Sequence, residues 1–238
     1  SMLNQENRNG NTFNGNAFVD ITFLKDFKFT FNVGTTVNEI RYYTTTNPYY
    51  GFGAEQNGTV TMYHYRTTTL NLQQILNYSH NFGKHNISVM LGHESYKYNY
   101  AELSASKKNM FSYWGNHELN GAVIDGSSAA SYSNDYNTEG YFFRALYDYD
   151  AKYYFSASYR RDASSRFHPD HWWGNFYSVG GAYLMSKEDW FDVKWIDMLK
   201  IKFSIGQQGN DNIGSYNYTD RYLSLIHISE PTRRSYIS

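Results

Sequence analysis

A strict alternation of apolar and polar residues constrains this chain more than any other feature. Residues 27–33 read Phe-Lys-Phe-Thr-Phe-Asn-Val, so every odd position is apolar and every even position is polar. Successive side chains of a β-strand point to opposite faces, so such a strand has one apolar and one polar side. The apolar side faces a core in a soluble β-sandwich, or lipid in an outer-membrane barrel whose polar side lines the interior. Both fold classes are compatible with this segment alone.

The composition favours the barrel. Aromatic residues make up 19% of the 238 residues and charged residues only 18%, whereas a typical soluble domain is about 25% charged. Tyr and Trp form girdles at the two membrane interfaces of a barrel. A net charge of −1 gives no basic surface for a nucleic-acid partner. The lack of cysteine excludes disulfides and thiol chemistry.

Eight segments show strand-like alternation or enrichment in β-branched and aromatic residues. They cover residues 17–23, 27–43, 58–80, 85–100, 138–149, 152–161, 174–185 and 199–208. The connections are short after the first, third and fifth segments and long after the second, fourth and sixth, with residues 101–137 as the longest irregular region. The connection after the seventh segment, residues 186–198, is intermediate. Beyond a short turn at residues 187–191, no helix is expected.

Short turns at one end and long loops at the other are typical of an outer-membrane barrel. Most of the segments also reach the length of about 9–11 residues that a tilted membrane-spanning strand needs. We therefore predict an all-β fold, an antiparallel up-and-down meander that forms a partial wall of a large transmembrane barrel. Residues 1–5 lack a basic and an apolar region, so we expect no signal peptide and an internal piece of a longer protein.

Several motifs resemble the barrel of SusC/RagA-type TonB-dependent transporters of Bacteroidetes. In order they are Arg160–Phe167 (RRDASSRF), Trp172–Gly174 (WWG), Ser178–Ala182 (SVGGA), Ser186–Phe191 (SKEDWF), Leu199–Lys202 (LKIK) and Gly209–Gly214 (GNDNIG). The likeness covers residues 17–218. It departs from the family at Ala163, Tyr177 and Gln207–Gln208.

The resemblance implies a segment of an outer-membrane importer for oligosaccharides or peptides. It implies three partners besides lipid: the TonB complex, acting through a plug domain without counterpart here, a SusD-like surface lipoprotein that closes the barrel, and the glycan or peptide ligand. A plugged barrel of this size has about 22 strands. It implies no cofactor.

The candidate ligand contacts lie in the long loops and at the end of the sixth segment. Trp114, Trp172 and Trp173 offer aromatic faces on which sugar rings can stack, or else they belong to an interface girdle or pack loop against loop. Arg160 and Arg166 can contact an anionic ligand, or they form a salt-bridge network that orders the rim.

Two polar loops have metal-ligand residue types without a metal-site pattern. His168, Asp170 and His171 could bind a divalent cation, but a solvated loop is the simpler interpretation. Asp211 with Asn210 and Asn212 could bind calcium, but the EF-hand pattern is missing and a polar turn is favoured. We predict no metal site.

No nucleophile elbow, paired carboxylates or zinc-protease motif occurs in the sequence, so we predict that the chain is not an enzyme. Two other hypotheses remain. One is a self-contained small outer-membrane barrel that acts as an adhesin or structural protein, since eight strands can close. The other is an outer-membrane hydrolase, which requires a catalytic group that the sequence does not show.

The C-terminal residues break the strand pattern. Residues 225–234 read LIHISEPTRR and resemble translated sequencing-adaptor sequence. We divide the chain into a partial barrel at residues 1–223 and a non-native tail at residues 224–238, which we expect to be disordered.

Overall fold

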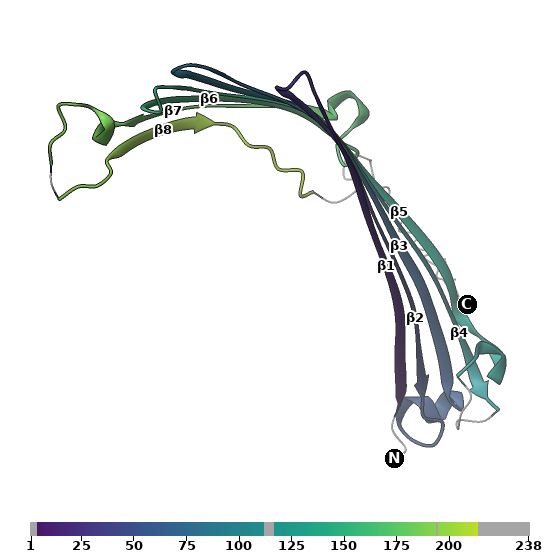
Figure 1. The fold of residues 1–238 in the computed structure, drawn as a ribbon. Coiled ribbons are helices and arrows are strands. Elements are labelled where there is room, and N and C mark those ends of the chain that lie inside the picture. Colours follow the sequence, from purple (N-terminus) through teal and green to yellow (C-terminus); the bar gives the residue numbers. More distant parts are fainter. Residues whose placement is uncertain (1–3, 112–116, 194, 214–238) are drawn as a thin grey trace, which may run out of the picture.

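Eight antiparallel strands follow one another in a single sheet, in the order of the sequence. The computed structural model describes residues 4–111, 117–193 and 195–213. The strands are β1 (Gln5–Phe23), β2 (Phe27–Thr46), β3 (Thr59–Phe82), β4 (His85–Met110), β5 (Ala122–Tyr149), β6 (Tyr153–Ser164), β7 (Trp173–Leu184) and β8 (Lys200–Gly206). The sheet is strongly bent, and the chain after β8 runs beneath the arch that β6 and β7 form (Figure 1).

The structure confirms the predicted all-β antiparallel meander, and within the described residues β1 and β8 each have one strand neighbour, so the sheet is open. The expectation of an irregular region over residues 101–137 was wrong: β4 continues to Met110 and β5 already begins at Ala122. β1 likewise begins at Gln5 rather than at residue 17. The predicted turn at residues 187–191 directly follows the 3₁₀ turn η4 (Met185–Lys187), and in it the Phe191 N–H donates to the Glu188 carbonyl at 3.0 Å. The proposed tail, residues 224–238, lies outside the described residues.

One face of the sheet carries a continuous apolar belt. The strand register places Ile21 opposite Phe29, Phe29 opposite Leu76, and Leu76 opposite Leu91. The same row continues through Phe143, Tyr159 and Tyr177. The belt comprises the outward side chains of residues 17–23, 27–33, 72–80, 85–91, 141–149, 153–159, 177–183 and 201–205.

The opposite face, which we call the inner face, is mainly polar. Because side chains alternate strictly, the register fixes its members: even-numbered residues in every strand except β3, where they are odd-numbered. Lys28, Thr30 and Asn32 lie on this face beside Asn77, Ile75 and Gln73 of β3.

Within the described residues, no second layer of protein covers the belt. Phe155 is 57% exposed, Val179 is 56% exposed and Phe203 is 70% exposed. By contrast, the buried apolar residues among those described are Val60, Met110 and Ala122, which pack together far from the belt. No helix in the described part of the chain is long and apolar enough to span a bilayer. A large apolar surface without a core is expected where lipid, not protein, covers it.

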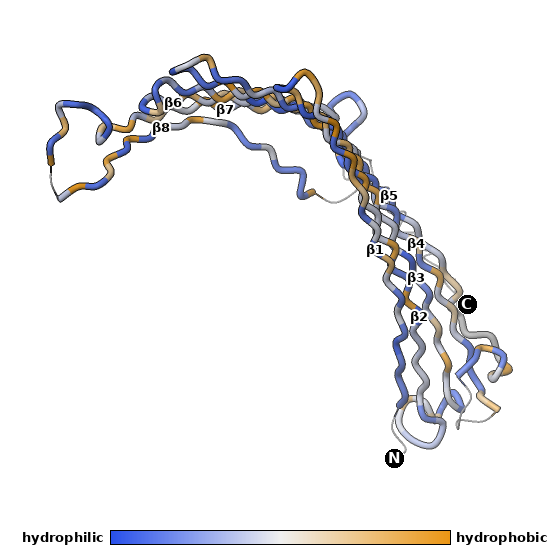
Figure 2. The backbone as a smooth tube through the Cα atoms, viewed as in Figure 1, coloured by the Kyte–Doolittle hydropathy of each residue, from blue (hydrophilic) through white to orange (hydrophobic). Residues whose placement is uncertain are grey.

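At the end of the sheet opposite the tight turns, which lies at the bottom of Figure 1, β1 to β5 extend well beyond the belt. β6 to β8 end close to the belt. We call these extensions the upper wall: residues 5–16, 34–46, 59–71, 93–110 and 122–139. The tube of β1 changes from hydrophobic to hydrophilic colours toward the N-terminus (Figure 2). The connections β2–β3, β4–β5 and β6–β7 join strands at the far end of the upper wall or at the end of β6. The tight turns lie at the opposite end of the sheet, together with the longer connection between β7 and β8 at residues 185–199.

The three tight turns use left-handed backbone conformations. Leu24 and Lys25 have φ values of 50° and 61°, and Asp150 and Ala151 have values of 54° and 50°. Two consecutive residues with positive φ match the type I′ hairpin turn. The third turn has Gly83 at φ 68°. Only glycine adopts this region without steric cost, so the non-glycine turns are strained.

This strain predicts opposite effects for two substitutions. Ala151→Gly should stabilise the folded protein by ~1 kcal/mol, because glycine removes the clash of a Cβ atom at positive φ. Gly83→Ala should destabilise it by a similar amount, although its Cβ would meet no atom within 4 Å. The temperature at which the folded band of the full-length protein disappears on heating before electrophoresis checks both. Shifts of the same sign in the two variants would contradict the backbone argument.

Candidate functional site

An ion-pair cluster lies on the inner face where β4, β5 and β6 meet. Arg160 Nε lies 2.7 Å from each carboxylate oxygen of Asp162, and its Nη2 lies 3.4 Å from Oε2 of Glu94. The guanidinium also stands 5.5 Å above the centre of the Phe142 ring. Two acids and one arginine thus form a group that can exchange partners with a charged or hydroxylated ligand.

Two glycines make room for this cluster. A Cβ atom at Gly140 would lie 2.4 Å from Oδ1 of Asp162 and 3.0 Å from Nη2 of Arg160. At Gly92 it would lie 2.1 Å from the ring of Phe142, which faces it directly across β4 and β5. The glycines therefore let the ring and the ion pair lie flat against the sheet.

A second cluster ties the chain after β8 to the ends of β5 and β6. Oδ2 of Asp211 accepts hydrogen bonds from Tyr136 Oη and from Ser164 Oγ, the latter at 2.9 Å. Arg166 Nη1 donates to the Asp211 carbonyl at 3.0 Å, and its guanidinium stands 4.2 Å above the Tyr136 ring. We call these four residues the Asp211 cluster. It joins the motifs at residues 160–167 and 209–214, which are remote in sequence.

The electrostatics of the Asp211 cluster keep Asp211 charged. Burial by itself raises the pKa of its carboxyl, but hydrogen bonds from Tyr136 and Ser164 and the nearby charge of Arg166 outweigh burial, so the pKa lies below 3.8. Burial and the hydrogen bond to Asp211 raise the pKa of Tyr136 to about 12. At neutral pH the pair is therefore a carboxylate and a neutral phenol, the protonation states that their hydrogen bond requires.

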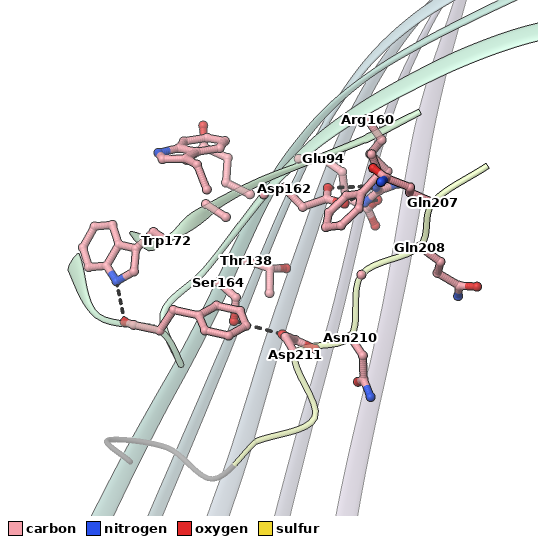
Figure 3. Close-up of a pocket in the computed structure, with 18 of the residues that line it drawn as sticks. Glu94, Thr138, Arg160, Asp162, Ser164, Trp172, Gln207, Gln208, Asn210 and Asp211 are labelled. Atoms are coloured by element: carbon pink, nitrogen blue, oxygen red, sulfur yellow. Dashed lines mark hydrogen bonds and ion pairs between the residues drawn. The ribbon is translucent and has the colours of Figure 1, made fainter. Parts of the chain in front are cut away.

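A cavity of about 740 Å³ lies between the two clusters. Its walls are the inner face of β4 to β7 and the chain at residues 207–211, and Phe176 and Trp172 border it. Figure 3 shows Arg160 and Asp162 on one side and Ser164 and Asp211 on the other. Its lining is charged, hydroxylated and aromatic, and suits a polar ligand better than an apolar one.

The structure brings four of the five sequence-predicted contact residues to this region. Arg160, Trp172 and Trp173 belong to the cavity lining, and Arg166 belongs to the Asp211 cluster at its edge. Trp172 Nε1 donates to the Phe167 carbonyl at 2.9 Å. Trp114 lies outside the described residues.

Trp173 is placed differently. It is in register with Ala163 and has the parity of Tyr177 and Val179, so its side chain points to the face that carries the belt. There it stacks on Tyr141 at 6.0 Å between ring centres, with Arg161 4.9 Å above its ring. This arrangement at the edge of the belt matches the interface-girdle alternative. A ligand contact by Trp173 stays a prediction.

The loop at residues 168–171 and the chain at residues 210–212 show no cation-binding geometry. His168 Nδ1 lies 3.4 Å from the Asp170 carboxylate, and the rings of His168 and His171 are 6.4 Å apart. The Asp211 carboxylate already accepts two hydrogen bonds. Among the described residues, no three His, Cys, Asp or Glu side chains are grouped as a metal ion requires.

Sequence reasoning missed Glu94 and Tyr136. Both lie on strands remote from the motif at residues 160–167, and only the register of β4, β5 and β6 brings them beside it. The sequence did indicate the face on which they lie, because Glu94 and Tyr136 are even-numbered and the apolar Leu91 and Phe143 of the same strands are odd-numbered. What the sequence lacked was the pairing of strands at those positions.

The geometry defines a class of protein, the wall of an outer-membrane type of β-barrel. Its marks are an open antiparallel meander, one continuous apolar belt, a polar inner face and tight turns at one end only. No protein-family model matches the chain, so individual relatives carry the assignment.

Three curated relatives are TonB-dependent receptors. The chain is 28% identical to TonB-dependent receptor P3 of Formosa agariphila over 94% of its own length, and 27% identical to TonB-dependent receptor SusC of Bacteroides thetaiotaomicron over 93%. It is 30% identical to TonB-dependent receptor P39 of Formosa agariphila over 60% of its length. It spans 22% of the first two and 14% of the third.

Solved structures agree. The chain superposes on the RagAB peptide transporter with a TM-score of 0.83 at 26% identity, over 90% of its length and 24% of that chain. The open-open state of the RagAB peptide importer gives the same values. The chain is a barrel segment of a SusC/RagA-like TonB-dependent transporter. These relatives are receptors and transporters, which agrees with the prediction that the chain is not an enzyme.

The Asp211 cluster generates a prediction. Asp211→Asn removes the charged acceptor of two hydrogen bonds, each worth roughly 1.5 kcal/mol or more. Amide hydrogen exchange at residues 207–213 of the full-length protein should therefore accelerate about tenfold or more. Asp170→Asn, whose side chain is 80% exposed, removes the same charge nearby and should leave this exchange unchanged. Equal effects of the two variants would show that net charge, not the cluster, holds the segment.

The same cluster predicts a pH dependence. Because the pKa of Asp211 is lower in the folded state, its contribution to stability is complete above an unfolded value of about 3.9 and is lost as the pH falls through the folded pKa. Protection of residues 207–213, corrected for intrinsic exchange, should thus be constant from pH 5 to 7 and decrease below pH 4. In Asp211→Asn this acid-dependent decrease should disappear. Its persistence would assign the transition to another group.

Proposed function

We propose that the chain is part of the barrel wall of an outer-membrane importer that takes up oligosaccharides or peptides with energy from the TonB complex. The observation that carries this proposal is the belt: one uninterrupted apolar row across all eight strands, backed by a polar inner face. A wall of this kind separates lipid from a water-filled or plugged interior.

The relatives support the partners. One is named SusC and others are RagAB peptide transporters, and the family resemblance adds a SusD-like surface lipoprotein as lid and a plug domain that contacts TonB. The chain spans about a fifth to a quarter of these relatives, so the lid, the plug and TonB are proposed for the whole transporter. In that assembly Arg160, Arg166 and Trp172 lie beside the passage and contact the ligand as it enters.

A self-contained small barrel is the competing function, as an adhesin or structural protein. Such a barrel requires β1 to pair with a strand at the other end of the sheet. In the described part of the chain β1 pairs with β2 alone and β8 with β7 alone. An open sheet leaves edge groups without hydrogen-bond partners in lipid, at several kcal/mol for each group. This observation favours a segment of a larger barrel.

Two adjacent residues test the belt. Val89 belongs to the belt and Ser88 to the inner face. Val89→Arg should destabilise the full-length transporter in lipid vesicles by about 2–4 kcal/mol, because a charge then faces hydrocarbon. Ser88→Arg should change stability by much less. Equilibrium unfolding in urea measures both, and equal destabilisation would contradict the assignment of the two faces.

Uptake by whole cells tests the transport function. Cells that depend on the full-length transporter should import its glycan or peptide substrate, and removal of the TonB-contacting segment should abolish import without reducing the amount of folded barrel in the outer membrane. Import that is independent of TonB would contradict the proposal. So would a folded protein that mediates attachment and no uptake.

A further inference from the structure

The inner face of the upper wall is a field of tyrosines. Its members, placed by the register of β2 to β5, are Tyr42, Tyr63, Tyr65, Tyr96, Tyr98, Tyr100, Tyr132 and Tyr136. The outward face of the same wall holds Tyr43 as its tyrosine. This bias of eight to one exceeds what a tyrosine-rich composition produces by chance. We call the eight residues the tyrosine field.

Seven of the eight rings lie close to another ring of the field, in three groups. Ring centres of Tyr42 and Tyr63 lie 5.4 Å apart. Tyr100 lies 6.2 Å from Tyr65 on one side and 6.2 Å from Tyr132 on the other. The Tyr96 and Tyr136 rings are also 6.2 Å apart. Aromatic neighbours at such distances stabilise one another and hold the surface in place before a ligand arrives.

Most of the other side chains on this face end in hydroxyl or amide groups. Thr12 donates to Asn38 at 3.0 Å and Thr36 to Asn14 at 2.9 Å. The hydroxyls of Thr61 and Ser106 are 3.0 Å apart. Such groups both donate and accept hydrogen bonds, as the hydroxyls of a sugar chain do.

Three charged groups within the field contact tyrosines, and the first is Glu6, which shares a hydrogen bond with Tyr42. Arg8 donates to Tyr65 Oη and stands 5.7 Å above that ring. Glu102 accepts a hydrogen bond from Tyr100. Together Glu6, Arg8 and Glu102 carry one net negative charge, which disfavours an anionic ligand.

Two amide oxygens on the same face lack a hydrogen-bond donor. They are Oδ1 of Asn71 and Oδ1 of Asn134, which lie opposite Tyr96 and Tyr100 in the register. A buried acceptor without a donor is costly. A ligand rich in hydroxyl groups can supply the missing donors once the neighbouring rings rotate.

We propose that the tyrosine field binds neutral oligosaccharides and leads them down to the cavity between Arg160 and Asp211. The inference rests on the proposed import function and adds the chemical class of the substrate. The C–H groups on one side of a sugar ring are weakly positive and match the negative face of an aromatic ring. An extended peptide is a poorer fit, because it binds best at a free sheet edge, whereas β2, β3 and β4 are paired on both sides.

A binding experiment with the full-length transporter in detergent tests this. The probes are an immobilised array of neutral oligosaccharides of six to eight sugars, a matched array of uronic-acid oligosaccharides, and random heptapeptides. We expect binding to neutral oligosaccharides. Tyr98→Ala and Tyr42→Ala should each weaken it about five- to tenfold through the lost stacking surface, whereas Tyr98→Phe keeps the ring and most of the affinity.

Tyr43→Ala is the matched control, since Tyr43 neighbours Tyr42 on the same strand and points to the opposite face. Equal losses in Tyr42→Ala and Tyr43→Ala would overturn the proposal. So would selective binding of peptides or acidic oligosaccharides, or no binding to any array by a transporter that still imports. If TonB-dependent uptake is still observed in any of those cases, the proposed import function stands and only the binding proposal fails. Binding of neutral oligosaccharides without uptake would instead contradict the import function alone.

Discussion

The uninterrupted antiparallel register is the constraint on which the rest of this structure depends. From β1 to β8 neighbouring strands pair without a shift, except for one irregularity between Ala105 and Lys107 of β4. Because side chains alternate with a period of two, this register keeps each of the two faces continuous across the whole sheet. The belt, the cavity and the tyrosine field all follow from it, although their residues are remote in sequence.

The same parity explains how much of the fold could be predicted from sequence. Around the belt one face is apolar and the other polar, so hydropathy alternates and the strands at residues 27–33 or 153–159 are evident. In the upper wall both faces are polar. The first half of β1, residues 5–16, and much of residues 101–137 then lose the alternating signal even though the backbone continues to pair. An alternating hydropathy pattern therefore reveals a strand only where its two faces have different surroundings.

The candidate site divides along similar lines. Arg160 and Arg166 were identified from a local charge cluster, and the structure places both at the inner face. Glu94 and Tyr136 could not be identified, because their contacts with Arg160 and Asp211 depend on which strands pair beside the cavity. Trp173 shows the opposite case: its loop position suggested a ligand contact, while its odd number, shared with Tyr177, already indicated the outward face.

A ladder built in this way also limits how such a protein can change its length. Loss or gain of one residue inside a strand would exchange the lipid-facing and interior-facing side chains along everything beyond it on that strand. Loss or gain of two residues keeps every side chain on its original face. Changes in the long connections, such as the one that contains η1 (Gly51–Gln56), do not alter the faces at all. Evolutionary variation in chain length should therefore accumulate in these connections, where it leaves both faces of the sheet unchanged.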